Sequence, residues 1–114
     1  MEKVEIYYFH PTNGCRSCST VGDFAEETVK TYFPNEIKSK KLVFNHINYQ
    51  DSSNAELVKQ YEVTGSSLMI GVHNTTRFYK ESVHKAWYMT GNQTQYMNYL
   101  KGVIDLRLAG DFFD

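Results

Sequence analysis

The two cysteines of this sequence, Cys15 and Cys18, carry its clearest chemical signal. A structural disulfide stabilises a fold chiefly by closing a long loop in the unfolded chain, and the loop between these two residues is very short. Small disulfide-stabilised domains also carry more than two cysteines. The C-x-x-C spacing therefore indicates a reactive dithiol.

The flanking residues predict a role for each thiol. Turn-forming residues follow an apolar run at residues 4–9, and a helical pattern then starts at Cys15. At a helix N-terminus the free N–H groups and the helix dipole favour a thiolate, and the charge of Arg16 favours it further. Cys18 lies one turn later on the same face, so it can attack a mixed disulfide on Cys15. We predict that Cys15 is the nucleophile and Cys18 the resolving thiol.

Two other interpretations of the cysteine pair stay open. Free cysteines are often small buried core residues. The spacing also fits half of a zinc site, but a structural zinc ion needs four ligands and the chain has no second C-x-x-C. His10, five residues before Cys15, could add a ligand, as could another histidine brought close by the fold. The remaining histidines show no metal-binding spacing: His46, His73 and His84. We predict no resident metal.

Length and charge narrow the class of protein. The chain has 114 residues, the size of one domain, with 12 Lys and Arg against 13 Asp and Glu. This balance argues against nucleic acid or an anionic membrane as the main partner, because both need a cationic surface. No segment approaches the roughly 20 apolar residues that span a bilayer. An apolar run begins soon after Met1 with no visible signal peptide, so we expect a cytoplasmic protein, or a periplasmic one if a leader was removed.

The elements that must position the cysteines follow from the hydrophobic pattern, which predicts the order β-α-β-α-β-β-α. In chain order we expect a strand at 4–9, a helix from Cys15 closed by Pro34 and Asn35, a strand at 42–47, a helix opened by a capping box from Ser53 to Glu56, a strand at 68–72, a hairpin turn at 73–75, a strand at 77–79, and a last helix capped by Asn92.

This order predicts one α/β domain over residues 1–109. A strand–helix–strand unit forces a parallel first pair, and the hairpin adds an antiparallel edge, so we expect a mixed four-stranded sheet with helices on both faces. Residues 81–91 are ambiguous, with Trp87 expected to pack on the core. Residues 110–114 are predicted to form a frayed tail.

The sequence resembles the thioredoxin superfamily over nearly its whole length. The resemblance rests on the strand at 4–9, on the motif Cys15-Arg16-Ser17-Cys18, and on residues 61–70, which are similar to the stretch leading into the third core strand of thioredoxins. It implies a thioredoxin-like fold and thiol–disulfide exchange with a protein or small disulfide.

A narrower resemblance rests on residues 7–15. Tyr7-Tyr8-Phe9-His10 followed by Thr12-Asn13-Gly14-Cys15 is similar to a small bacterial thioredoxin-like group that carries the name nitrophenyl compound nitroreductase subunit of arsenical-resistance clusters. No flavin or nicotinamide fingerprint is visible, so we expect no cofactor and no autonomous nitroreductase activity.

Two positions depart from the thioredoxin pattern. Ser67 matches the position of the cis-proline that faces the dithiol in thioredoxins, and the only prolines here are Pro11 and Pro34. A cis bond before a non-proline costs about 2.5–4 kcal/mol, so we expect a trans bond before Ser67 and a substrate groove of different shape. Phe9 matches the position of a buried aspartate that assists proton transfer, so this transfer needs another group or water.

These observations favour a monomeric thiol–disulfide oxidoreductase with a protein redox partner. Arg16-Ser17 replaces the Gly-Pro of thioredoxin, so we expect a different redox potential. The alternative is a thioredoxin-like accessory module whose thiols capture a soft metal or metalloid or dock on a partner. A purely structural interaction domain is the third hypothesis.

Overall fold

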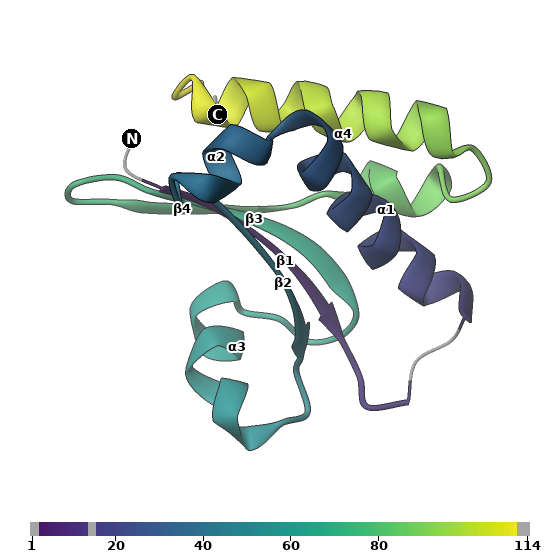
Figure 1. The fold of residues 1–114 in the computed structure, drawn as a ribbon. Coiled ribbons are helices and arrows are strands. Elements are labelled where there is room, and N and C mark those ends of the chain that lie inside the picture. Colours follow the sequence, from purple (N-terminus) through teal and green to yellow (C-terminus); the bar gives the residue numbers. More distant parts are fainter. Residues whose placement is uncertain (1–2, 14–15, 112–114) are drawn as a thin grey trace.

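The computed structural model describes residues 3–13 and 16–111, with the side chains of residues 16–18 outside this description. Its elements are β1 (Lys3–His10), α1 (Arg16–Tyr32), α2 (Pro34–Lys38), β2 (Leu42–Asn48), the 3-10 turn η1 (Ser52–Asn54), α3 (Ala55–Tyr61), β3 (Ser67–His73), β4 (Phe78–Ser82), the 3-10 turn η2 (His84–Tyr88) and α4 (Gln93–Leu108) (Figure 1). Within the described ranges, no helix is long and apolar enough to cross a bilayer.

The four strands form one mixed sheet in the order β2-β1-β3-β4. β1 runs parallel to β2, and the β1–β3 and β3–β4 pairs are antiparallel. The predicted α/β architecture is therefore confirmed. Because β1 and β3 are antiparallel, the last residues of β1 meet the first residues of β3: Phe9 is the register partner of Ser67.

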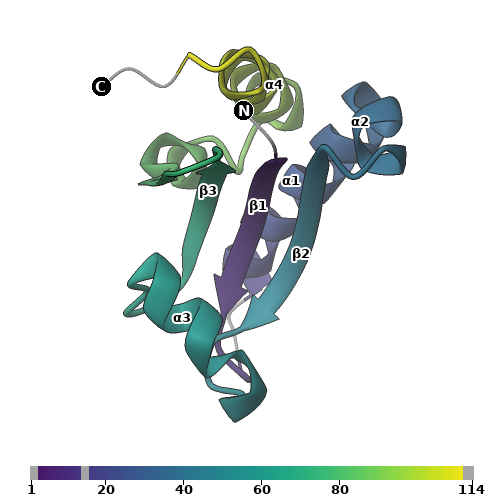
Figure 2. The same ribbon diagram turned by 90° about the vertical axis from the view of Figure 1, so that its left-hand side faces the viewer.

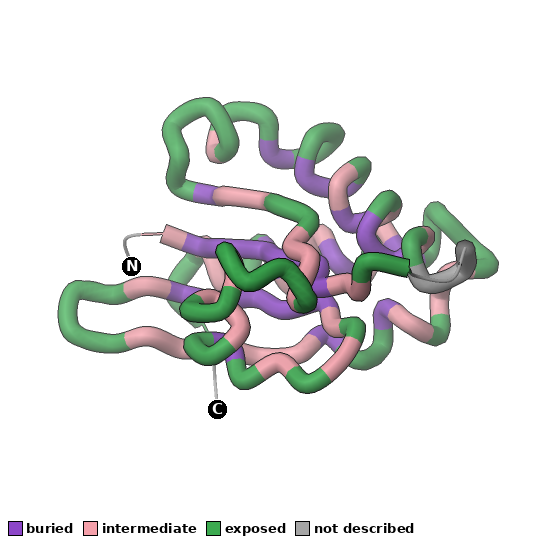
Figure 3. The backbone as a smooth tube through the Cα atoms, turned by 90° about the horizontal axis from the view of Figure 1, so that it is seen from below, coloured by how far each residue is buried: buried purple, intermediate pink, exposed green. Residues whose placement is uncertain are grey.

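Helices cover both faces of the sheet, and α3 lies on the side opposite α1 (Figure 2). Successive side chains of β1 point to opposite faces of the sheet, as in any β-strand. Val4, Ile6 and Tyr8 pack in the larger core, which α1 and α4 complete. Tyr7 and Phe9 pack in a smaller core with Tyr61 of α3. Buried residues accordingly concentrate along the central strands and on parts of the helices (Figure 3).

A buried carboxylate ties α3 to the sheet. The Tyr61 hydroxyl donates to Glu5 Oε1 at 2.8 Å, and His73 Nε2 donates to the same oxygen at 2.8 Å. Lys3 Nζ lies 3.1 Å from the other oxygen. Glu5 is paired with Gly71 across the strands, and a Cβ at Gly71 would overlap the Tyr61 hydroxyl. We call Glu5, Tyr61, His73 and Lys3 the Glu5 network.

The pKa of Glu5 reflects this arrangement. Burial works to raise the pKa, but hydrogen bonds from His73, Tyr61 and Lys3 outweigh it, so the pKa lies below its ordinary value. Burial and then the bond to Glu5 raise the pKa of Tyr61. Glu5 is therefore an ionised carboxylate at neutral pH, and Tyr61 is a neutral donor.

One predicted helix boundary was wrong, and one short helix was not predicted. α1 ends at Tyr32, just before Pro34 as expected, but Pro34 also begins α2, where its missing N–H removes no helical hydrogen bond. The capping box from Ser53 to Glu56 does not form. Instead, Asp51 Oδ1 accepts from the Ser53 N–H at 3.0 Å and caps the short turn η1, and α3 starts directly after that turn.

The C-terminal part of the chain follows the prediction more closely. Asn92 caps α4 as expected, because its Oδ1 accepts from the Gln95 N–H at 3.0 Å. The ambiguous segment continues β4 to Ser82 and then forms η2, from which Trp87 packs on the larger core. Asp111 N–H donates back to the Leu106 carbonyl at 2.8 Å. Residues 112–114 lie outside the described residues, so the frayed tail stays a prediction.

Candidate functional site

The predicted dithiol motif lies where β1 leads into α1. Arg16, Ser17 and Cys18 belong to the first turn of α1, which begins at Arg16. Cys15 lies outside the described residues, and so do the side chains of the other three. The nucleophilic and resolving roles of the cysteines, and the electrostatic role of Arg16, therefore stay predictions.

Ser67 lies at the same end of the sheet as the motif. It is the first residue of β3, is half-buried, and pairs with Phe9 near the end of β1. Its hydroxyl donates to the Gly65 carbonyl at 3.0 Å. The described part of the chain contains no cis peptide bond, so the bond before Ser67 is trans, as expected from its residue type.

The loop that approaches the motif is held by side chains from the end of β2. The Thr12 N–H donates to Gln50 Oε1 at 2.8 Å, and Asn48 Nδ2 donates to the Thr12 hydroxyl at 3.1 Å. Asn48 Oδ1 accepts in turn from the Gln50 N–H at 2.9 Å. We call Thr12, Asn48 and Gln50 the Thr12 clamp. The clamp fixes Thr12, which lies four positions before the start of α1 at Arg16.

His10 is the last residue of β1 and the nearest described histidine to the motif in sequence. Its Nδ1 lies 2.9 Å from the Pro11 carbonyl oxygen. Because a carbonyl oxygen only accepts hydrogen bonds, Nδ1 carries the proton. The imidazole stacks on the Tyr8 ring with centroids 5.8 Å apart and planes 22° apart.

Tyr8 connects β1 with the helix that carries the motif. Its ring is buried and also contacts the rings of His46 and Trp87, at centroid distances of 5.9 and 6.3 Å. A Cβ built at Gly22 of α1 would overlap the Tyr8 ring. Glycine at this position therefore allows α1 to approach β1 closely. Burial, and then the charge of Asp23, raise the pKa of Tyr8.

A shallow cavity adjoins the Ser67 end of the sheet. It measures about 280 Å³ and is lined by Ser66, His84, Trp87 and Tyr88. The Tyr88 side chain is 87 % exposed. No sequence signal marked this cavity, because the pattern of residues 81–91 is neither helical nor extended.

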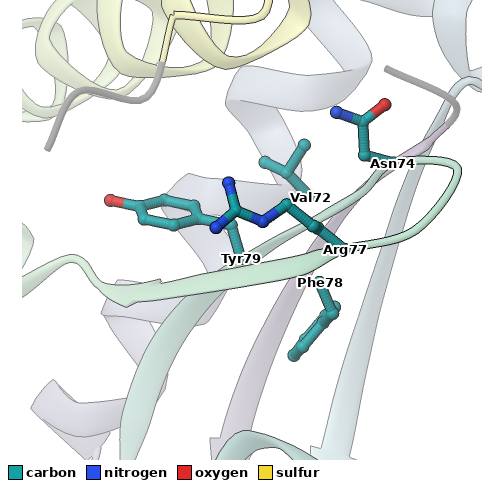
Figure 4. Close-up of a pocket in the computed structure, with 5 residues that line it drawn as sticks. All are labelled: Val72, Asn74, Arg77, Phe78 and Tyr79. Carbon is teal, nitrogen blue, oxygen red and sulfur yellow. The ribbon is translucent and has the colours of Figure 1, made fainter.

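A second cavity lies away from the motif, at the β3–β4 hairpin (Figure 4). It measures about 270 Å³ and is lined by Val72, Asn74, Arg77, Phe78 and Tyr79. Val72 lies five residues along β3 from Ser67, which is about 17 Å at the rise of a strand. This cavity is therefore not part of the motif site.

The described residues contain no group of three or more His, Cys, Asp or Glu side chains that could hold a metal ion. The side chains of the two cysteines lie outside the described residues. The metal interpretation of the dithiol therefore stays a hypothesis.

Comparison with known proteins places the fold. No protein-family model matches the sequence, and no curated protein sequence matches it. A thioredoxin from Thermus thermophilus superposes with a TM-score of 0.55 at 14 % identity, over 91 % of this chain and 75 % of the other. A malarial protein superposes with a TM-score of 0.44 at 16 % identity, over 69 % of this chain and 79 % of the other. Neither comparison supports the narrower resemblance to a nitroreductase subunit. The chain has a thioredoxin-like fold.

Proposed function

We propose that the protein is a thiol–disulfide oxidoreductase in which Cys15 attacks a disulfide and Cys18 resolves the mixed disulfide. The observation that carries this proposal is the place of the C-x-x-C motif in the fold. Arg16, Ser17 and Cys18 form the first turn of α1, the helix that follows the central strand β1 of a thioredoxin-like sheet, and Cys15 precedes them in the sequence.

The start of a helix suits the chemistry. The first N–H groups of α1 have no partner within the helix, and together with the helix dipole they stabilise a thiolate on Cys15. Arg16 adds a positive charge beside it. Cys15 attacks the substrate disulfide and releases one substrate thiol. Cys18 then attacks the Cys15 sulfur, which releases the second thiol and leaves Cys15 and Cys18 joined as a disulfide.

The substrate in this proposal is a protein disulfide or a small disulfide that reaches the motif from the Ser67 end of the sheet. Ser67 supports the shape of this entrance, together with Ser17 of the motif. The electrons come from the dithiol itself, so the exchange needs no bound cofactor. We place the protein, as a monomer, in a bacterial cytoplasm, where reducing conditions keep the dithiol available.

Titration of the Cys15 thiolate tests the proposal. The rate of alkylation is measured against pH in the wild type and in Cys18→Ser, with Cys15→Ser as the control for background labelling. An apparent pKa well below the free-cysteine value of about 8.5 supports the oxidoreductase. An ordinary or raised pKa would remove the reason for placing a nucleophile at the start of α1.

A module that captures a soft metal or metalloid through the same two thiols is the second candidate. The observation in its favour is serine at position 67, which leaves more room beside the dithiol than a proline ring. Titration of the reduced protein with trivalent arsenic distinguishes the two candidates. Protection of both thiols at stoichiometric arsenic, without reduction of disulfides, would favour the capture module.

A further inference from the structure

We propose that His10 accepts the proton that Cys18 must lose when it resolves the mixed disulfide. This inference rests on the proposed function. A thiol attacks only as its thiolate, and a free cysteine is mostly protonated near neutral pH. A base beside Cys18 would therefore speed resolution. Phe9, next to His10 in β1, is fully buried and has no group that could serve.

The register of β1 and α1 brings His10 to the first turn of α1. Even-numbered side chains of β1 face α1, and His10 stacks on Tyr8, over which α1 passes at Gly22. From Tyr8 to His10 the strand advances about 6.6 Å. α1 runs antiparallel to β1. At a rise of about 1.5 Å per residue, the same distance along α1 corresponds to about four residues, counted from Gly22 toward the N-terminus of the helix. By this count the helix backbone at Cys18 lies level with His10.

The tautomer of His10 suits a base. Nδ1 carries a proton, which it donates to the Pro11 carbonyl oxygen at 2.9 Å, so the neutral ring offers the lone pair of Nε2. No described residue bonds to Nε2. The same bond holds the ring plane, and stacking on Tyr8 supports it from one face. His10 is half-buried, so solvent can exchange the proton afterwards.

His46, on the neighbouring strand, has a different hydrogen-bond partner from that of His10. His46 of β2 contacts the Tyr8 ring from another side, and its Nε2 lies 2.8 Å from Glu26 Oε1. Lys30 binds the other Glu26 oxygen at 2.6 Å. His46 Nε2 thus donates to Glu26, which lies about two turns of α1 beyond Cys18, so His46 is held farther from the first turn of α1 than His10.

Other polar groups lie on the elements packed around Tyr8, the ring on which His10 stacks. They are the Tyr8 hydroxyl of β1, Asn48 of β2, Asp23 and Glu26 of α1, and His84 of η2. Asp23 acts on Tyr8 and Glu26 on His46, whereas Asn48 is neutral. Tyr8 alone among these groups shares a face of β1 with His10, and its raised pKa keeps the hydroxyl protonated near neutral pH.

The proposed step balances in protons and electrons. Cys18 gives its proton to His10 Nε2, and its sulfur electron pair forms the bond to the Cys15 sulfur. The bond between Cys15 and the substrate sulfur breaks, and the substrate leaves as a thiolate. The imidazolium then gives the proton to that thiolate or to solvent, which restores neutral His10. No further oxidant or reductant is needed.

Dithiobis-nitrobenzoate separates the two chemical steps, because each releases one coloured thionitrobenzoate. Cys15 attack releases the first, and resolution by Cys18 releases the second. The variant His10→Asn keeps an amide N–H in the place of Nδ1–H but has no base. Near neutral pH we expect the second release to slow by about tenfold or more, with the first release unchanged within about twofold. The difference should shrink at alkaline pH, where Cys18 ionises without help.

Matched variants make the outcome decisive. His46→Asn should leave both releases unchanged, and thermal melting checks that each variant is folded. If His10→Asn does not fold, His10→Gln removes the base with a longer amide. An unchanged second release in a folded His10 variant would overturn the role of His10 and leave the oxidoreductase standing. Absence of a second release from the wild-type protein would overturn both.

Discussion

The hydroxyl of Tyr61 offers the sharpest test of the packing that positions β3. Replacing Tyr61 by phenylalanine removes one donor from the buried Glu5 carboxylate and leaves the ring in place. Tyr61 is 1 % exposed and Glu5 is 6 % exposed, so water cannot replace the lost hydroxyl without opening the α3–sheet interface. α3 leads into the segment before Ser67, so this contact also anchors the entrance to the candidate site.

The magnitude follows from the type of bond. A hydrogen bond to a charged group contributes about 1.5–3 kcal/mol. His73 and Lys3 still bind the carboxylate in the variant, so no charge is left wholly unpaired. We therefore expect the free energy of unfolding to fall by about 1.5–3 kcal/mol near neutral pH, and not by the larger cost of an orphaned buried ion.

The pH dependence has a definite sign. The pKa of Glu5 is lowered in the folded state, so its ionised form stabilises the fold above the unfolded value of about 4.5, and this contribution is lost as pH falls through the folded pKa. Once Glu5 is protonated the Tyr61 bond becomes a neutral one, worth about 0.5–1.5 kcal/mol. The cost of Tyr61→Phe should therefore shrink in acid.

Urea unfolding of the wild type and Tyr61→Phe, from neutral pH into acid, measures both effects. Tyr88→Phe is the matched control, because its ring is 87 % exposed and its loss of a hydroxyl should change stability by less than about 0.5 kcal/mol. Equal costs for the two variants, or a Tyr61 cost that grows in acid, would refute the assignment of Glu5 as the charged centre of this network.

Two further substitutions test how the motif is positioned. Gly22→Ala should lower stability by about 1–2 kcal/mol in urea unfolding, because overpacking against the buried Tyr8 ring exceeds the gain in helix propensity. Gly102→Ala in α4 meets no atom within 4 Å and should instead stabilise by up to about 1 kcal/mol, so equal signs would contradict the close contact at Tyr8. Gln50→Ala removes the acceptor of the Thr12 N–H and should speed hydrogen exchange at that amide about two- to tenfold, with no change if the Thr12 clamp does not hold the loop.

Local patterns in the sequence were enough to predict most of the fold. The apolar run of β1, the turn residues after it and the helical spacing of α1 are properties of neighbouring residues. Their order forces β1 and β2 to be parallel, which the structure confirms. The missed helix α2 and the wrong start of α3 are also local, but each had competing signals. Proline suits the start of a helix as well as the residues after one, and Asp51 lies close enough to replace Ser53 as the cap.

The candidate site also combines features that the sequence predicts with contacts that only the fold creates. The sequence by itself determined the C-x-x-C motif and its place between a strand and a helix, because both are read within a few residues. Only the tertiary structure brought Ser67 to Phe9, Gln50 to Thr12, and Tyr61 to Glu5, pairs that lie from 38 to 58 residues apart. Such pairs depend on how strands pair and helices pack, and periodicity carries no information about which distant polar groups will meet. The stacking of His10 on Tyr8 under α1 depends on the same packing.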